Sequence, residues 1–400
     1  MMPSARNPVA APPAGSAPQL PALTSLRFFA AFAILVLHYR DLLGPLPPWV
    51  LKGVIGGQYG VTFFFVLSGF ILTYNYHGWF SAGVSDGRYW RFQRLRVARI
   101  YPVYVLGLLL DTPWHVIERV QVGQLAEAGH SYWASWLLNL LGLQAWVPGV
   151  PYAMFWNAPA WSVSAEIFFY ATFPFLCAAL ARRIVTQRGL VASFVAVVLI
   201  ESLLYVALVY GLTYVAKVSA QTQYLLMVYT PLLHYGEFMA GCLAGLYFVR
   251  MRTMTRVLRS GWLQSRRSRN LVIALSLAAV AVRVWSSDYT GPSAMAWLLD
   301  VSLKYSIFIL PFTAIILAVA SGRTFLTPLL EHPWLVLLGE ASYSLYIIHW
   351  AGQTFLRMGF LGAYGGPVVN GAVLLGTVAA SLLCYRYFEV PWRRRLRGAS

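Results

Sequence analysis

The side chains with the clearest capacity for chemistry are an arginine and a histidine in the first long apolar segment, LTSLRFFAAFAILVLHYR. Arg27 and His38 are 11 residues apart, which in an α-helix is a rise of about 16 Å and close to three whole turns. They should therefore share one helix face at two depths in a membrane. A histidine there could act as a general base or as a nucleophile. The alternative is an arginine that reaches the membrane surface and a hydrogen-bonded structural histidine.

Two more arginines occur where the segment RYWRFQRLRVARIYP enters an apolar stretch. Arg96 and Arg99 are one turn apart, so they lie on the same face of the predicted helix. Guanidinium groups bind phosphate through bidentate, charge-assisted hydrogen bonds. The pair could therefore hold a phosphorylated substrate, or it could only mark the loop as cytoplasmic.

Polar residues interrupt three other apolar segments. Glu166 in WNAPAWSVSAEIFFY and His349 in GEASYSLYIIHW are both expected near the depth of His38, with Tyr343 below His349. Ser68 belongs to GVTFFFVLSGFILTY, where small residues favour close helix packing. Because ionisable groups are costly in lipid, the convergence of His38, Glu166 and His349 predicts a polar cavity across the bilayer.

The elements that position these residues follow from the composition. The chain has 400 residues, of which 59% are hydrophobic and only 11% charged, whereas soluble domains carry roughly 25% charged residues. Long uninterrupted apolar runs also differ from the alternating pattern of a transmembrane β-barrel. The sequence therefore predicts an all-α, polytopic integral membrane protein.

About ten transmembrane helices are expected from runs near 20 residues long. The predicted spans are 23–40, 57–76, 97–112, 160–181, 190–212, 224–249, 271–286, 298–320, 334–357 and 366–388. The Trp-rich stretch 131–146 precedes Pro148 and Pro151, and we assign it to the membrane interface rather than across the bilayer.

Loop charges give the expected orientation. The formal net charge is +17, and with ten spans the arginine clusters fall on alternate loops and at the C-terminal end. Positive loops face the cytoplasm, so both termini are predicted to be cytoplasmic, and the charge requires no nucleic acid partner. The expected domains are a disordered tail (1–22), a transmembrane domain (23–390) and a basic cytoplasmic tail (391–400).

No metal site is predicted, because the seven histidines and three cysteines form no ligand spacing. No permanently bound cofactor is expected either.

Taken in order, the motifs resemble those of the acyltransferase family 3 membrane proteins. The resemblance extends from about residue 22 to 397. It rests on the Arg-x10-His pattern of Arg27 and His38 and on five further motifs: GVTFFFVLSGFILT, RVARIYPVY, WNAPAWSVSAE, GEASYSLYIIH and FEVPWRR. The family often shows other residues around WSVSAEIFF, and many bacterial members carry an SGNH-type domain that we do not expect here.

The resemblance implies transfer of an acyl group, commonly acetyl, from cytoplasmic acyl-CoA to a hydroxyl of a carbohydrate or related acceptor. His38 then matches the catalytic histidine, Arg27 its partner, and Arg96 and Arg99 the Arg-x-x-Arg motif that would bind the donor. Glu166 is a candidate catalytic residue, and Ser68, Tyr343 and His349 are candidate lining residues.

The acceptor is left open among a saccharide, a lipid-linked saccharide and a natural product. The expected location is the bacterial cytoplasmic (inner) membrane, with the lipid bilayer as the surrounding partner. A transporter or flippase for a glycan or small acid is the alternative, because the same polar residues would line a path.

Overall fold

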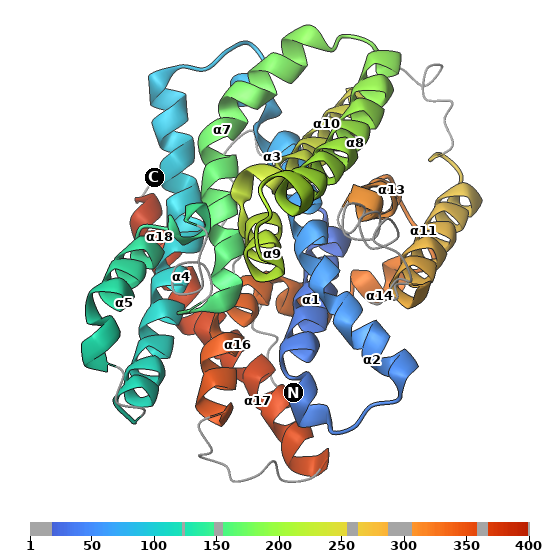
Figure 1. The fold of residues 1–400 in the computed structure, drawn as a ribbon. Helices are drawn as coiled ribbons and strands as arrows, with labels where there is room; N and C mark the ends of the chain where they lie inside the picture. Colours follow the sequence, from blue (N-terminus) through green and yellow to red (C-terminus); the bar gives the residue numbers. More distant parts are fainter. Residues whose placement is uncertain are drawn as a thin grey trace.

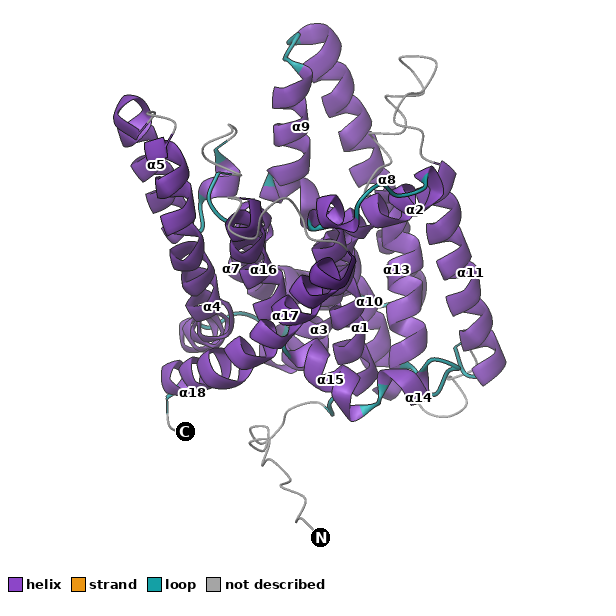
Figure 2. Ribbon diagram, turned by 90° about the horizontal axis from the view of Figure 1, so that it is seen from below, coloured by secondary structure: helices purple, strands orange, loops and turns teal. Residues whose placement is uncertain are grey.

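The structure is a computed structural model that describes residues 18–121, 125–147, 155–253, 263–286, 306–357 and 367–398. Within these ranges all regular structure is helical (Figures 1 and 2). The α-helices are α1 (Pro21–His38), α2 (Pro48–Ile55), α3 (Gly60–Phe80), α4 (Asp86–Gln121), α5 (Leu125–Leu140), α7 (Trp161–Arg183), α8 (Gln187–Tyr210), α9 (Ala220–Tyr229), α10 (Tyr235–Thr253), α11 (Arg266–Ser286), α13 (Ser306–Ala320), α14 (Thr327–Leu330), α15 (Pro333–Glu340), α16 (Ser342–Arg357), α17 (Pro367–Cys384) and α18 (Val390–Arg397). Short helical turns that matter below are η2 (Gly56–Tyr59), η4 (Ala158–Ala160), η6 (Pro231–His234) and the π-helical turn η8 (Tyr385–Glu389).

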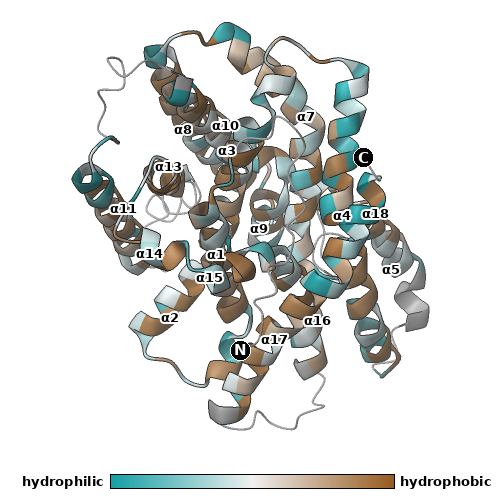
Figure 3. Ribbon diagram, turned by 180° about the vertical axis from the view of Figure 1, so that it is seen from behind, coloured by the Kyte–Doolittle hydropathy of each residue, from teal (hydrophilic) through white to brown (hydrophobic). Residues whose placement is uncertain are grey.

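The outer surface of the bundle is apolar. Helix α8 exposes Val191, Leu199, Ile200 and Leu203, and hydrophobic colour covers much of α8 and α13 in Figure 3. Eight helices among the described residues are long and apolar enough to cross a membrane. Because such a surface is stable only against lipid or another apolar partner, the predicted all-α, polytopic membrane fold is confirmed.

Two predicted spans are broken rather than continuous. The segment 224–249 divides at Thr230, whose extended backbone precedes Pro231, and continues through η6 into α10. The segment 334–357 divides at Ala341 into α15 and α16, where the Ser342 hydroxyl bonds the carbonyl of Gly339. Of the predicted span 298–320, only the 15 residues of α13 lie within the described part.

The Trp-rich stretch 131–146 contains the end of α5, which packs along the second half of α4. Tyr101 donates to the carbonyl of Leu140 at 2.8 Å, and Trp136 donates to the Thr112 hydroxyl at 2.9 Å. The two helices therefore run antiparallel and side by side. The depth of α5 in the bilayer stays a prediction.

The centre of the bundle depends on close contact between α3 and α10 (Figure 1). A Cβ atom on Gly69 would collide with the carbonyl of Phe238, and one on Gly241 would collide with the carbonyl of Val66. The two glycines therefore let the backbones approach closely, as the small residues of this motif predicted. The contact fixes α3, which carries Ser68, against the rest of the bundle.

Both described ends of the chain lie at one end of the bundle (Figure 2). Pro18 and Pro21 near the start, and Arg393, Arg394 and Arg397 near the finish, border the same cavity. We call this the arginine-rich end. The predicted tail 391–400 is helical as far as Arg397 and packs on α4. Of the predicted tail 1–22, residues 1–17 lie outside the described part, and α1 begins at Pro21.

Candidate active site

A cavity of about 1090 Å³ opens at the arginine-rich end. Helices α1, α3, α4, α7 and α15 to α18 contribute to its walls. Its volume is at the upper limit of ordinary small-molecule sites. The described residues that line it include seven arginines: Arg27, Arg96, Arg99, Arg386, Arg393, Arg394 and Arg397. Its two acidic lining residues in the described part are Glu166 and Glu340. The cavity is therefore suited to a polyanion.

Arg27 and Arg99 face the cavity from α1 and α4. Both side chains are half-buried, and neither forms a hydrogen bond or ion pair with another described residue. A guanidinium group has five N–H donors and stays charged. The N–H groups of Arg27 and Arg99 therefore have no partner within the described protein, and they could donate hydrogen bonds to a phosphate.

Arg96, one turn before Arg99, is held by aromatic rings. Its guanidinium donates to the Tyr76 hydroxyl at 2.8 Å and lies 5.1 Å from the centre of that ring. The rings of Phe92 and Tyr170 lie within 6 Å on other sides. Cation–π contacts of this kind fix the direction of the side chain. The predicted pair Arg96 and Arg99 is therefore brought together on one cavity wall.

Glu166 lies in the same cavity, on α7. Its carboxylate accepts a hydrogen bond from Tyr170 at 2.6 Å and a long one from Ser68 at 3.5 Å. The structure does not bring Glu166 together with the two histidines, because Glu166 borders the arginine cavity and neither His38 nor His349 does. Packing of α7 against α3 places Glu166 beside Ser68 instead, which hydropathy alone could not predict.

Two tyrosines of α16 also line the cavity. Tyr343 donates to the carbonyl of Ile100 on α4 at 2.8 Å. Tyr346, one turn further along, donates to the carbonyl of Pro159 and lies 2.8 Å from the Ser162 hydroxyl. The predicted lining residues Ser68 and Tyr343 are thus in the cavity wall, whereas the predicted lining residue His349 is not.

His38 and His349 meet just beyond Tyr346. The Nδ1 atom of His38 lies 2.8 Å from Nε2 of His349, and the rings are nearly parallel. The ring of His349 is 6.1 Å from the ring of Tyr346, so His349 lies directly behind a side chain that lines the cavity. His349 is fully enclosed, whereas His38 is only half-buried.

The structure also adds residues that were not predicted as site residues. Helix α18 and the preceding π-helical turn η8 supply Arg386, Arg393, Arg394 and Arg397. Glu389 beside them accepts from Ser344 at 2.8 Å and pairs with Arg393 at 3.9 Å. The sequence signal was the motif FEVPWRR, whose arginines we interpreted only as a basic tail.

Within the described ranges, no group of three or more His, Cys, Asp or Glu side chains is arranged to hold a metal ion. The side chains of the cavity and of the histidine pair instead supply guanidinium, carboxylate, phenol and imidazole groups. An arginine-lined cavity that ends at an aromatic wall, with paired imidazoles behind it, can bind an anionic substrate and present a distant group to a base or nucleophile. The fold and site thus define a membrane-embedded protein with an arginine-lined pocket suited to an anionic substrate.

The comparisons with known proteins name the class of enzyme. The family model of the acyltransferase domain, family 3, matches residues 20–386. The chain therefore belongs to acyltransferase family 3, whose members transfer acyl groups. Among curated proteins it is similar to the acyltransferase MdmB of Streptomyces mycarofaciens, with 34% identity over 177 residues. That match covers 42% of this chain and 42% of the relative, less than half of either. No solved structure matches the chain.

Proposed function

We propose that this protein is an O-acyltransferase of the bacterial cytoplasmic membrane. It moves an acyl group, most simply acetyl, from acyl-CoA to a hydroxyl of a carbohydrate or related acceptor. The observation that carries the proposal is the alignment of an arginine-lined cavity with the His38–His349 pair behind it. The arginine-rich end faces the cytoplasm, in accord with the distribution of positive loops, and that is where acyl-CoA is available.

Donor binding is assigned to the arginines. Coenzyme A carries its phosphates at one end and its thioester on a long flexible arm. Arg99 and Arg27 have uncommitted donors, and α18 adds further positive charge at the cavity mouth. Hydrogen bonds between arginine and phosphate are charge-assisted and bidentate. With the phosphates there, the arm would extend along the cavity toward Tyr346.

The hydrogen bonds of the histidine pair assign a role to each nitrogen. The Nδ1 atom of His349 lies 3.1 Å from the carbonyl of Leu345, and a carbonyl only accepts, so Nδ1 of His349 carries a proton. In neutral His349, Nε2 is then an acceptor. It accepts from Nδ1–H of His38, which leaves Nε2 of His38 with its lone pair. His349 is therefore a positioning residue, and His38 is the base.

The proposed reaction is a direct transfer. Nε2 of His38 takes the proton of the acceptor hydroxyl as that oxygen attacks the thioester carbonyl carbon. The carbon–sulfur bond breaks, the new ester forms, and the proton passes from His38 to the thiolate, so coenzyme A leaves as the thiol. The same lone pair could first take the acyl group as an acyl-imidazole. Only that covalent route adds acyl mass to the protein when no acceptor is present.

Tyr346 has a defined part in this scheme. Its ring lies between the cavity and His349, and its hydroxyl is held by Ser162 and the carbonyl of Pro159. We therefore expect the thioester to pass this ring on its way to His38.

Incubation of the purified protein with radiolabelled acetyl-CoA and candidate hydroxyl acceptors tests the proposal. The expected result is label in a product whose mass has increased by one acetyl group, lost in His38→Ala. A transporter would instead move its substrate across proteoliposomes with no covalent change. If the label stayed in acetyl-CoA and the mass of every acceptor stayed unchanged, the proposed O-acyltransferase activity would be overturned.

A further inference from the structure

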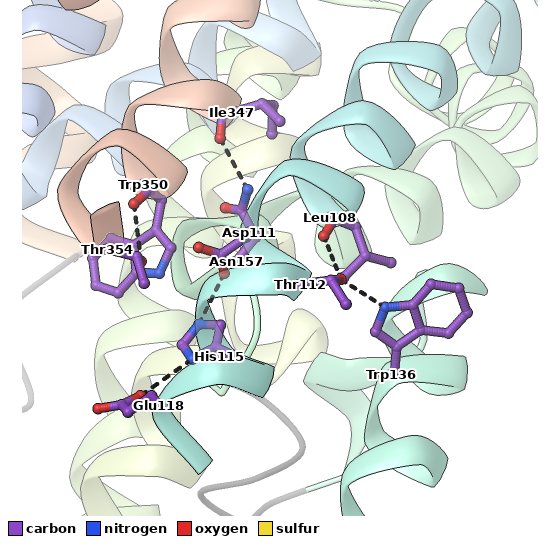
Figure 4. A network of polar contacts seen from close by, with 10 residues as sticks. All are labelled: Leu108, Asp111, Thr112, His115, Glu118, Trp136, Asn157, Ile347, Trp350 and Thr354. Atoms are coloured by element: carbon purple, nitrogen blue, oxygen red, sulfur yellow. Dashed lines mark hydrogen bonds and ion pairs between the residues drawn. The ribbon is translucent and has the colours of Figure 1, made fainter. Parts of the chain in front are cut away.

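A second polar cluster lies at the opposite end of the bundle from the arginine-rich end. Asp111 follows Arg99 by 12 residues on α4, about 18 Å of helix rise. Its carboxylate contacts Nε2 of His115 at 2.9 Å, and Nδ1 of that ring faces the exposed Glu118 at 3.7 Å. Figure 4 shows these side chains beside Asn157 and Trp350. Asn157 and Trp350 belong to segments singled out in the sequence, but Asp111, His115 and Glu118 belong to none of them, and none of these five residues lines the donor cavity.

Several polar atoms of the cluster are enclosed without a hydrogen-bond partner. They are Oδ1 of Asp111, Oδ1 of Asn157 and Nε1 of Trp156. Asp111 is fully buried, and Asn157 and Trp156 are 3% and 2% exposed. A buried polar group without a partner costs about 1–3 kcal/mol. Their occurrence at one place therefore indicates a ligand with which they pair.

The cluster is continuous with the catalytic histidine. The amide of Asn157 donates to the carbonyl of Ile347 on α16, and Trp350 lies one turn further along that helix (Figure 4). The Trp350 ring stands edge-on to His38 at 5.2 Å between ring centres. Gln353 donates to the carbonyl of His38 at 2.9 Å. Nε1 of Trp350 and Oε1 of Gln353 are also enclosed without partners.

The available atoms define the chemistry of the ligand. Asp111, Asn157 and Gln353 supply oxygen acceptors, and the two tryptophans supply N–H donors and aromatic faces. A hydroxyl both donates and accepts, so a ring with several hydroxyls satisfies both kinds of group. An ionised carboxylate has no donor hydrogen and would leave the oxygen acceptors of Asp111, Asn157 and Gln353 unpaired. A hydrocarbon would leave every one of these groups unpaired.

We propose that Asp111, Asn157, Trp350 and Gln353 form the acceptor subsite, and that the acceptor is a neutral, polyhydroxylated ring compound. This rests on the proposed acyl transfer and adds where the acceptor binds. The acceptor approaches His38 from the end opposite the arginines, past the half-buried Trp350 and Gln353. Donor and acceptor thus reach one imidazole from opposite ends, and only the acyl group crosses between them.

The experiment measures acetyl transfer from acetyl-CoA to octyl β-D-glucoside, a neutral sugar with four hydroxyls. Because the glucoside is itself a detergent, the full-length protein is purified in another detergent, and the glucoside is added only as the acceptor. Asn157→Leu removes an acceptor at nearly constant volume, and Asp111→Asn removes the charge. Each should raise KM for the glucoside about tenfold, the effect of roughly one hydrogen bond, while the Kd for acetyl-CoA stays unchanged. Thr112→Val is the matched control, since its hydroxyl pairs with Leu108 and Trp136, away from the cluster.

The outcomes separate this subsite from the proposed function. Unchanged glucoside KM in both variants, or an equal rise in Thr112→Val, overturns the acceptor subsite and leaves the cluster a structural network. If the native protein binds and hydrolyses acetyl-CoA but acetylates no glucoside, the neutral polyhydroxylated acceptor is overturned while acyl-CoA chemistry stands. Absence of acetyl-CoA binding overturns the proposed function itself. Size-exclusion profiles and acetyl-CoA binding establish that each variant is folded.

Discussion

Replacing His349 tests the assignment of the histidine pair most directly. In His349→Leu, Nδ1–H of His38 loses the acceptor that now lies 2.8 Å away. A buried donor left without a partner costs about 1–3 kcal/mol, and each 1.4 kcal/mol is a factor of about ten. If the orientation and tautomer of His38 depend on that bond, kcat should fall about 5- to 140-fold. The KM for acyl-CoA should not change, because His349 does not line the donor cavity.

Steady-state turnover with varied acyl-CoA provides the measurement. His349→Gln is the conservative variant, since its side-chain carbonyl can accept the same proton, and it should recover most of the lost kcat. In a His38→Ala background, His349→Leu should have no further effect. An unchanged kcat in His349→Leu would refute the positioning role. A loss that appears equally in KM, or that persists unaltered in His349→Gln, would show general disruption of the site instead.

Three other predictions follow from the same geometry. His38→Ala should abolish acyl transfer in a protein that still elutes as a folded species, and near-native turnover would remove His38 from the mechanism. Arg96→Ala and Arg99→Ala should each weaken acyl-CoA binding about 10- to 100-fold by titration, as expected for a lost hydrogen bond to a charged group. Arg94→Ala is the control, because Arg94 is exposed on the same helix and does not border the cavity. If all three variants weakened acyl-CoA binding equally, Arg96 and Arg99 would have no specific role in donor binding and would serve only to orient the chain in the membrane. Gly241→Leu should lower the melting temperature in detergent, since its side chain would collide with the α3 backbone; an unchanged value would mean that the two helices are not in close contact.

The sequence by itself determined the membrane class and the spacing of groups within single helices. Hydropathy is a local property of the chain, so it predicts apolar helices without knowledge of their partners. The rise of an α-helix is fixed, so the separation of Arg27 from His38 and the shared face of Arg96 and Arg99 followed from residue numbers. The family resemblance was likewise available from the order of the motifs, and the family match confirms it.

Only the tertiary structure decided which helices bring their polar groups together. His38 and His349 are 311 residues apart and pair because α1 packs on α16. Glu166 was expected near the depth of His38, and the structure places it against Ser68 in the arginine cavity, because the offset between two helices depends on side-chain packing rather than on hydropathy. Only the tertiary structure likewise showed that the arginines of α18 border the cavity and that Oδ1 of Asn157 is buried without a partner. Helix geometry sets distances along one helix, whereas close contacts such as that of Gly69 with α10 set them between helices.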